Sequence, residues 1–360
     1  MSTPTLGVVV INFGEPAEPT AEAVVPFLER IFLQNSDLEG RAGDTARARE
    51  LAENRAPGLL EEYREIGGSP LNEQADAQAR ALAAELEARG RDDVRVYSAF
   101  QFTEPSIAVC VDRAVADGVE QLVAVPAYPL CGQSTTVAAL RAVRAALDAH
   151  PEGPDLRAVA GWHHHPAYAS LRAEHVREWV EREGLDLSAS DTLLYFSVHG
   201  TPIKYLDEGN RYDRYVEEHC RDIARRLGAR SHAVGFQNHG NRRIAWTQPD
   251  NEHRIRELAQ RRLVVVPISF MHEQSETLAE LDHELREFVE GCGKEFHRVP
   301  VPHDDRRFIR FLADLVGALA DPTVPEGVLT PCRCSPGRAT FCTNGHRDLP
   351  ASPYAPADVS

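Results

Sequence analysis

The sequence lacks an excess of positive charge. Its 39 Lys and Arg residues are outnumbered by 55 Asp and Glu residues, and the formal net charge over the 360 residues is −16. Nucleic-acid-binding proteins concentrate basic residues to neutralise phosphates, so this balance argues against nucleic acid as a partner. The hydrophobic content of 42% and the charged content of 26% are typical of an ordinary globular protein, and the length allows two domains with buried cores.

Long hydrophobic runs are also absent. A membrane-spanning helix needs about 20 consecutive apolar residues, and no segment approaches that length. The first apolar run ends at Asn12 and has no basic residues before it, which predicts a first strand and no signal peptide. We therefore expect a cytoplasmic protein, while the sequence leaves peripheral contact with a membrane and the oligomeric state open.

Cysteine is sparse. The seven cysteines are an odd number spread over the whole chain, unlike the dense, even set of a small secreted domain held by disulfides. Three of them stand alone in predicted regular elements and are expected to be small buried residues: Cys110, Cys220 and Cys292. The other four require a different explanation, which depends on their neighbours.

Short valine-rich strands alternate with helices along most of the chain, which predicts βαβ units and parallel sheets. Residues 126–140 match residues 267–281 without a gap, and this internal repeat pairs Pro126 with Pro267 and Leu140 with Leu281. We infer an α/β fold of two similar Rossmann-like domains, each a parallel sheet flanked by helices, that arose by duplication. The predicted domains cover residues 1–166 and 167–320, followed by a cysteine-containing extension over residues 321–360.

A buried strand runs directly into a helix between Pro267 and Glu284. Ser275 is a candidate N-cap of that helix, and Glu276, Glu280 and Glu284 follow at positions i, i+4 and i+8. Their carboxylates are therefore expected to form a file along one helical face. Such a file is either a solvated surface or a path for cations and protons.

The two copies of the repeat differ at positions that carry chemistry. Thr135 of the first copy becomes Glu276 in the second, and Phe13, which follows the first strand, becomes His199. The second half has therefore placed ionisable groups at the carboxyl ends of its strands, where open α/β sheets bind ligands. This difference favours a functional role for the acidic file.

Three adjacent histidines, His163 to His165, have the composition of a metal site. Neighbouring side chains in an extended loop point in different directions, so one shared ion is not favoured and a solvated loop is the simpler interpretation. The Gly67-Gly68-Ser69 segment is likewise interpreted as a tight turn, with an anion-binding role as the alternative.

Taken together, these stretches resemble the ferrochelatase family, whose enzymes insert Fe(II) into a porphyrin in haem synthesis. The resemblance runs from Leu6 to about Leu319. It is carried by motifs in the family's order and spacing: Ile11 to Pro16, Tyr63 to Pro70, Phe196 to Pro202, Val234 to Gln237, Pro267 to Phe270 and Glu276 to Asp282. Each motif alone is weak, whereas the complete ordered set is specific.

The resemblance implies roles for individual residues. His199 and Glu276 correspond to the catalytic pair, and the family's substrate iron is handled by these two together with Glu280 and Asp282. Metal insertion needs a group that binds iron and one that accepts pyrrole protons, and a neutral imidazole can do either. The residues implied to line or edge the porphyrin are Phe13, Arg55, Tyr63, Ile66, Ser69 and Trp246.

Some positions depart from the family pattern. Gln274 stands where many members have histidine, and Gln101 stands where many have arginine, so the roles of those two positions are not carried over. At Phe13 the protoporphyrin enzymes tend to have methionine and the coproporphyrin enzymes tyrosine. The natural porphyrin, protoporphyrin IX or coproporphyrin III, therefore stays open.

The C-terminal cysteines lie too close together in sequence for comfortable disulfides and fit a thiolate metal centre better. Some ferrochelatases hold a [2Fe–2S] cluster with three C-terminal cysteines and one from the first domain. This resemblance implies four ligands: Cys131, Cys332, Cys334 and Cys342. A zinc site completed by His346 and a disordered tail with free thiols are the alternatives.

Two other functions fit the same resemblance. One is a chelatase of the same fold for another metal, such as cobalt, because ligand identity alone seldom decides between divalent metals. The other is a non-catalytic porphyrin or metal carrier. A carrier predicts tight porphyrin binding without metal insertion.

Overall fold

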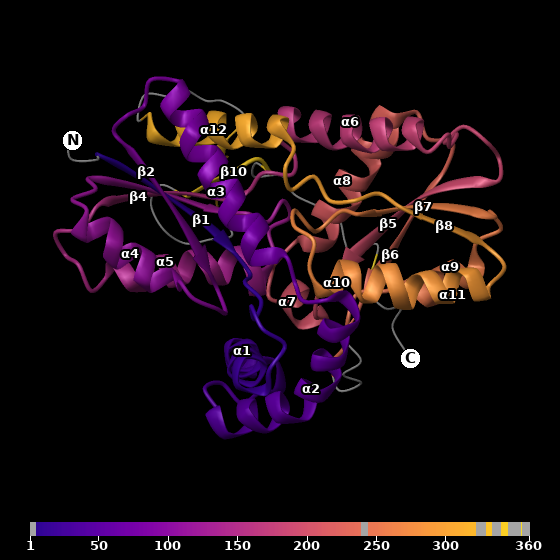
Figure 1. The fold of residues 1–360 in the computed structure, drawn as a ribbon, viewed down its shortest axis with the longest axis horizontal. Coiled ribbons are helices and arrows are strands. Elements are labelled where there is room, and N and C mark those ends of the chain that lie inside the picture. Colours follow the sequence, from indigo (N-terminus) through magenta and orange to yellow (C-terminus); the bar gives the residue numbers. More distant parts are fainter. Residues whose placement is uncertain (1–4, 239–243, 322–328, 333–339, 345–353, 355–360) are drawn as a thin grey trace. The chain divides into compact units, whose positions relative to one another are not determined.

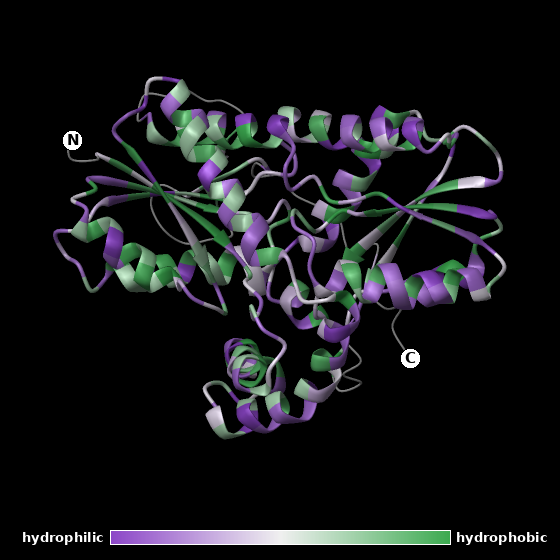
Figure 2. Cartoon of the chain, viewed as in Figure 1, coloured by the Kyte–Doolittle hydropathy of each residue, from purple (hydrophilic) through white to green (hydrophobic). Residues whose placement is uncertain are grey.

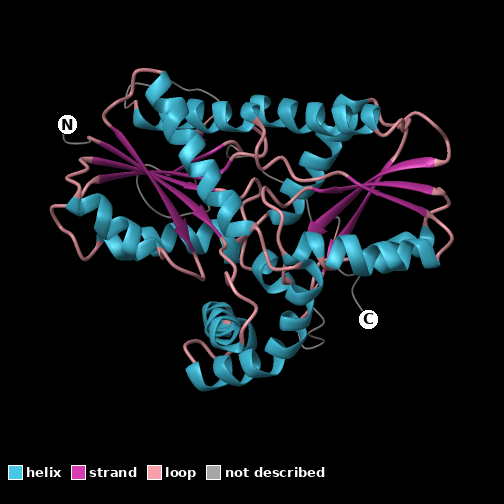
Figure 3. Ribbon diagram, viewed as in Figure 1, coloured by secondary structure: helices cyan, strands magenta, loops and turns pink. Residues whose placement is uncertain are grey.

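The computed structural model describes residues 5–238, 244–321, 329–332, 340–344 and 354. The chain divides into two compact units. The first contains Met1–Trp162 and His303–His346, and the second contains His163–Pro302 and Arg347–Ser360. Each unit is built around one sheet with flanking helices, which confirms the predicted α/β fold (Figure 3).

The sheet of the first unit has the strand order β2-β1-β3-β4-β10-β9. β1 pairs in parallel with both β2 and β3, as a βαβ arrangement requires. Helices α4 and α5 lie along one face of this sheet, and α3 and α12 lie along the other (Figure 1). The strands are β1 (Leu6–Asn12), β2 (Val94–Phe100), β3 (Gln121–Pro126), β4 (Asp155–Gly161), β9 (Thr330–Pro331) and β10 (Thr340–Cys342).

The described helical elements of the first unit connect these strands. They are α1 (Ala21–Gln34), a 3₁₀ helix (Ser36–Glu39), α2 (Thr45–Ile66), α3 (Leu71–Ala88), α4 (Ile107–Ala116), a π-helix (Gln133–Val137), α5 (Ala138–Leu147) and α12 (Arg306–Ala320). Side chains cap α1 and α2 at their N-termini, where Thr20 accepts from the Ala23 amide and Asp44 accepts from the Arg47 amide. Helices α1 and α2 pack against each other and form a small apolar core with Phe102.

Helix α12 belongs to the first unit, although sequence order predicts it in the second domain. It packs against α3 and against the sheet at β3 and β4. The rings of Phe308 and Phe311 lie 5.8 and 5.5 Å from the ring of Trp162, which follows β4. The apolar face of a helix shows that it is buried but not against which sheet, so sequence order alone misplaces it.

The sheet of the second unit has the order β6-β5-β7-β8, and its described strands are parallel. Helices α6 and α8 lie along one face, and α9, α10 and α11 lie along the other (Figure 1). The elements are α6 (Pro166–Arg182), β5 (Thr192–His199), α7 (Ile203–Asp207), α8 (Tyr212–Leu227), β6 (His232–Gln237), α9 (Asn251–Glu257), β7 (Arg262–Pro267), α10 (Ser275–Leu278), a π-helix (Glu280–Leu285), α11 (Arg286–Gly291) and β8 (Glu295–Arg298).

The two sheets repeat one topology. The order β2-β1-β3-β4 in the first unit corresponds to β6-β5-β7-β8 in the second. The matched prolines of the repeat, Pro126 and Pro267, are the last residues of β3 and β7. The internal repeat read from the sequence therefore corresponds to equivalent strands in the structure.

A glycine follows the first strand of each unit because neighbouring atoms leave no space for a side chain. Gly14 has φ +81°, and a Cβ there would lie 2.7 Å from Cβ of Phe100. At Gly200 a Cβ would lie 1.8 Å from Oδ1 of Asn238. These tight passages fix the backbone beside Phe13 and His199, the two residues that the repeat singles out.

The strands are apolar because helices cover both faces of each sheet (Figure 2). Every residue of β1 is buried, and so are the first seven residues of β5. The polar side chains at the ends of the strands therefore stand out as candidates for function. None of the helices in the described part of the chain is both long enough and apolar enough to span a membrane.

The C-terminal extension contributes strands to the first sheet. β10 pairs in parallel with β4, and β9 pairs antiparallel with β10. Extended pairing at these positions was not predicted, since two or three residues are too few for a period-2 pattern. Cys334 and His346, which are candidate metal ligands, lie outside the described residues.

Candidate active site

His199 and Glu276 meet at the carboxyl edge of the second sheet. His199 is the last residue of β5, and Glu276 lies in the single turn of α10 that follows β7. Because β5 and β7 are neighbouring parallel strands, their carboxyl ends bring these two segments together. The distance from Nε2 of His199 to Oε1 of Glu276 is 3.2 Å.

The tautomer of His199 follows from its second contact. Its Nδ1 lies 2.7 Å from the carbonyl oxygen of Gly200, and a carbonyl can only accept, so Nδ1 carries a proton. Nε2 therefore faces Glu276 with either a proton or a lone pair. A histidine that binds a metal through one nitrogen commonly donates the other N–H to a carbonyl in this way.

Opposing influences set the pKa of His199. Burial lowers this pKa, but the hydrogen bond and charge of Glu276 raise it, assisted by the Gly200 carbonyl and the charge of Glu280. The net effect is a pKa above the ordinary value of 6.5. At low pH a proton is therefore held between the imidazole and the carboxylate, and a divalent cation competes with it for the same two atoms.

The spacing of the pair suits one small cation. Two ligands about 2.1 Å from the same ion at a right angle are about 3.0 Å apart, close to the 3.2 Å observed. The side chain of His199 is 31% exposed, so an ion can reach it. The rings of Trp246 and Phe270 lie 6.4 and 6.5 Å from the imidazole and give the pair an apolar border.

Two glutamines hold the carboxylates of Glu276 and Glu280, a role that was not predicted from the sequence. Gln274 donates a hydrogen bond to Oε2 of Glu276. Gln237, which is opposite His199 in the β5–β6 register, donates to the Glu276 carbonyl at 2.9 Å and to Oε2 of Glu280 at 3.1 Å. The orientation of Gln237 is itself fixed, since its Oε1 accepts from Ser197 at 3.2 Å.

The helix after β7 differs from the predicted file of carboxylates. Gln274 is the N-cap, one residue before the predicted Ser275, and α10 ends at Leu278. A π-helix over Glu280–Leu285 then replaces α-helical geometry, so the i, i+4 spacing no longer stacks the three glutamates on one α-helical face. Periodicity cannot reveal such a wider turn, which often marks a functional site.

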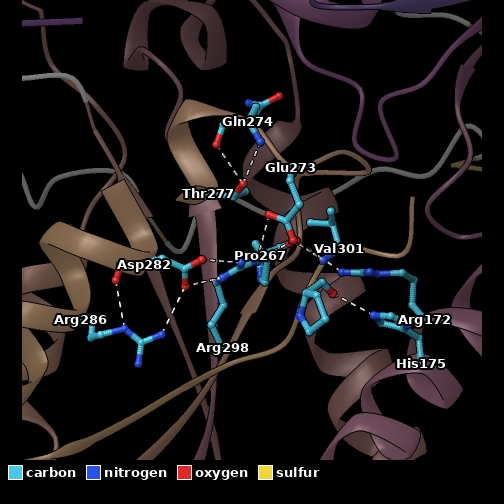
Figure 4. A network of polar contacts seen from close by, with 11 residues as sticks. Arg172, His175, Pro267, Glu273, Gln274, Thr277, Asp282, Arg286, Arg298 and Val301 are labelled. Carbon is cyan, nitrogen blue, oxygen red and sulfur yellow. Dashed lines mark hydrogen bonds and ion pairs between the residues drawn. The ribbon is translucent and has the colours of Figure 1, made fainter. Parts of the chain in front are cut away.

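Asp282 lies within an arginine network (Figure 4). Arg298 of β8, with a side chain only 9% exposed, donates to both oxygens of Asp282 and lies 2.9 Å from Oε1 of Glu273. Glu273 also accepts from the Val301 amide at 3.1 Å, and Arg286 donates to the Asp282 carbonyl at 3.0 Å. The carboxylate of Asp282 is thus held by arginine side chains, whereas that of Glu276 faces His199 and Gln274.

Several residues implied to contact the porphyrin gather in the first unit. Phe13 packs against Phe102 at 4.6 Å between ring centres, and Tyr63 and Ile66 join the same apolar cluster at the end of α2. The structure adds a buried carboxylate that the sequence did not single out. Glu15 accepts from the Tyr63 hydroxyl at 3.1 Å and from the Ser69 hydroxyl.

Arg55 has a different partner from Tyr63 and Ser69, which both bind Glu15. Its side chain is exposed on α2 and forms an ion pair with Glu62 at 2.6 Å. A charged group of a ligand would therefore have to replace or share the Glu62 contact. Trp246 belongs to the second unit, where it borders His199.

Three of the four cysteines predicted as cluster ligands belong to segments that neighbour one another in the first unit. Cys342 of β10 pairs with Gly161 of β4, and a Cβ at Gly161 would lie 3.4 Å from Cβ of Cys131. Cys332 follows β9, and its amide donates to the Thr340 carbonyl at 2.7 Å. Cys131 and Cys342 are buried, whereas Cys332 is partly exposed.

The ferrochelatase family model matches residues 5–319. The chain belongs to the ferrochelatase family. It is an enzyme, and its class of reaction is metal insertion into a tetrapyrrole. Two ferrochelatases illustrate the relationship. That of Thermosynechococcus vestitus is 34% identical over 328 residues, covering 88% of this chain and 83% of that protein. That of Synechococcus sp. strain JA-2-3B'a(2-13) is 35% identical over 344 residues, covering 89% and 97%.

Two solved structures share the fold of this ferrochelatase family member. SirB from Bacillus subtilis with Fe³⁺ has a TM-score of 0.52 at 10% identity, covering 87% of this chain and 96% of that one. CbiX, described as the terminal enzyme for biosynthesis of siroheme in denitrifying bacteria, has a TM-score of 0.50 at 16% identity, covering 87% and 98%. At these identities the likeness concerns the fold alone.

Proposed function

We propose that this enzyme inserts Fe(II) into a porphyrin, either protoporphyrin IX or coproporphyrin III, in haem biosynthesis, and that His199 and Glu276 perform the transfer. The observation that carries the proposal is the 3.2 Å contact between Nε2 of His199 and the Glu276 carboxylate, with Nδ1 tied to the Gly200 carbonyl. This pair holds either a proton or a cation. Metal insertion requires both, because two pyrrole protons leave as the ion enters.

The side chains of the site are proposed to have different roles. Nε2 of His199, when unprotonated, binds the incoming ion or accepts a pyrrole proton, and Glu276 supplies the compensating negative charge. Gln237 links the carbonyl of Glu276 to the carboxylate of Glu280 and so provides a second acidic group beside the pair. Glu280 then carries ions toward the pair or protons away from it.

Asp282 is proposed to have a structural role and not to bind iron. The family resemblance assigns it to the iron path, but Arg298 binds both of its carboxylate oxygens. A carboxylate already neutralised by a buried arginine is a weak ligand for a further cation. We therefore assign Asp282 to the support of the π-helix and restrict the iron path to His199, Glu276 and Glu280.

Each unit contains residues that we propose contact the porphyrin. In the first unit, Phe13 and Ile66 are partly exposed and offer apolar surface for a flat ring, while Tyr63 is 1% exposed and supports them from within the same cluster. Glu15 accepts hydrogen bonds from the hydroxyls of Tyr63 and Ser69. In the second unit, Trp246 offers a ring beside His199. Arg55 is proposed to bind a propionate of the porphyrin, which would replace Glu62 as its ion-pair partner.

The pH dependence of insertion tests the role of the pair. Insertion needs His199 without its Nε2 proton, and its pKa is raised above 6.5, so the rate should fall as the pH drops through that raised pKa. Glu276→Gln removes the two largest influences that raise the pKa of His199, while burial still lowers it, so the residual activity should begin to fall at a lower pH.

The measurement is the initial rate of porphyrin metallation from pH 5 to 9, a range about two units either side of neutrality. Glu287→Gln, at an exposed glutamate of α11, is the matched control and should leave the acidic side of the pH–rate profile unchanged. An acidic limb that Glu276→Gln does not move would exclude His199 as the titrating group.

We also propose that Cys131, Cys332, Cys334 and Cys342 hold a [2Fe–2S] cluster. Support comes from the sheet edge at Gly161, where β10 and β9 bring Cys342 and Cys332 to the strand that passes Cys131. Clusters of this type are generally held by four thiolates. The guanidinium of Arg144 interacts electrostatically with Cys332. When bound, the cluster would supply a redox-active iron centre.

The cluster predicts a coloured protein. Purified without oxygen, the chain should show visible absorption bands of a [2Fe–2S] centre and about two irons and two sulfides per chain. Cys342→Ser should abolish both, whereas Cys292→Ser, at an exposed cysteine, should change neither. A colourless wild-type protein that contains zinc, or no metal at all, would contradict the cluster.

A further inference from the structure

Three metal-ligating side chains of the second unit converge outside the candidate active site. One nitrogen of His163, one nitrogen of His164 and one carboxylate oxygen of Glu218 all lie within 4.8 Å of one another. Ligand atoms about 2.1 Å from one ion lie roughly 3.0–3.5 Å apart. Small side-chain rotations are therefore enough to bring all three atoms onto a single ion.

The loop at the histidines is not extended, contrary to the premise read from the sequence. His163 and His164 lie in a turn, which lets the two neighbouring imidazoles face one region. His165 has a different role. It is the N-cap of α6, and its Nδ1 accepts a hydrogen bond from the Ala167 amide at 3.2 Å. The run of three histidines is thus divided into two ligand candidates and one helix cap.

The packing of α6 and α8 holds one of the three ligands in place. His163 is 1% exposed, and its ring lies 5.3 Å from that of Tyr215 and 5.7 Å from that of His219, both on α8. Glu218 also belongs to α8, while His164 is exposed. A fixed buried imidazole beside two more accessible ligands is an arrangement that an ion can enter from solvent.

The charges around the group are compatible with a divalent ion. Glu217, the neighbour of Glu218, forms ion pairs with Arg214 and Arg221. Glu218 therefore supplies the anionic ligand of the group.

We propose that His163, His164 and Glu218 form a second metal site, distinct from the His199–Glu276 pair, for a divalent first-row transition ion. Two imidazoles and one carboxylate are the ligands that Zn²⁺, Co²⁺ and Fe²⁺ accept. Three protein ligands leave at least one coordination position for water. The site does not depend on the function proposed for the His199 pair.

Cobalt provides the probe, because Co²⁺ bound by nitrogen and oxygen ligands absorbs visible light and reports its own coordination. The full-length Glu276→Gln protein, in which the first pair is disabled, is titrated anaerobically with Co²⁺ at pH 7.5 (about one unit above the ordinary histidine pKa). One equivalent of Co²⁺ should bind with a visible spectrum. Adding His164→Ala or Glu218→Gln should weaken this binding by about tenfold or more.

Two matched variants control the titration. His165→Ala removes the adjacent histidine and Glu217→Gln removes the adjacent carboxylate, and both should retain the Co²⁺ spectrum. His164→Ala in the otherwise wild-type chain should leave porphyrin metallation unchanged. The proposal is overturned if the Glu276→Gln protein binds no Co²⁺, or if its Co²⁺ spectrum is the same with and without His164 and Glu218.

Discussion

His199→Ala and Glu276→Gln are each expected to lower metal insertion by about 10³-fold, the range lost when a positioned proton-transfer group is removed. Both changes should leave porphyrin binding largely intact, because neither side chain supplies the apolar surface that the ring covers. The expected loss of rate follows from the proposal that Nε2 of His199 and Oε1 of Glu276, which are 3.2 Å apart, hold the proton or the ion between them. Initial rates of metallation and porphyrin fluorescence quenching measure the two effects separately.

Nearby residues of the same types provide the controls for this comparison. His283→Ala and Glu287→Gln alter exposed side chains of the π-helix and of α11, and both variants should keep near wild-type rates. Retained turnover in both His199→Ala and Glu276→Gln would remove the assignment of the pair. Loss of porphyrin binding in step with the loss of rate would make these residues ring contacts instead.

Arg298→Ala is expected to destabilise the second unit by about 3–5 kcal/mol, the effect of removing one partner from a buried ion pair. Arg298 is 9% exposed and binds both Glu273 and Asp282, so its loss removes the buried guanidinium that these two carboxylates share (Figure 4). Hydrogen exchange of the β7 and β8 amides measures this local effect without assuming that both units unfold together.

Arg286→Ala is the matched control, since Arg286 also bonds to Asp282 but its side chain is 41% exposed. An exposed ion pair contributes about 1 kcal/mol or less, so the exchange rates should change little. Arg298→Lys keeps the charge but not the two-point contact and should fall between these variants. Equal effects of Arg298→Ala and Arg286→Ala would contradict the structural role given to the Asp282 network.

Much of the fold, and the proximity of His199 to Glu276, could be predicted from the sequence because both depend on local pattern. Short apolar runs predict β5 and β7, and the carboxyl ends of neighbouring parallel strands in an α/β sheet lie together. The repeat showed that His199 and Glu276 replace Phe13 and Thr135 at equivalent strand ends. These inferences need only the strand order and the position of each residue in its element.

The rest depends on contacts between distant segments. Gln237 and Gln274 are ordinary polar residues until the sheet register and the N-cap aim them at the carboxylates. Arg298 meets Asp282 across 16 residues of sequence, and the π-helix that carries Asp282 has no periodic signature. Glu15 likewise shows its role only when Tyr63 and Ser69 converge on it.

Anaerobic metallation by the wild-type chain decides between an enzyme and a carrier. Fe(II) is supplied with protoporphyrin IX or coproporphyrin III in separate cuvettes, and the loss of the free-base absorption bands is followed over time. We expect catalytic conversion, with many turnovers per chain and one porphyrin preferred over the other, and that preference identifies the natural substrate. Tight binding of both porphyrins without metallation of either would contradict the proposed function and make His199 and Glu276 ligand contacts.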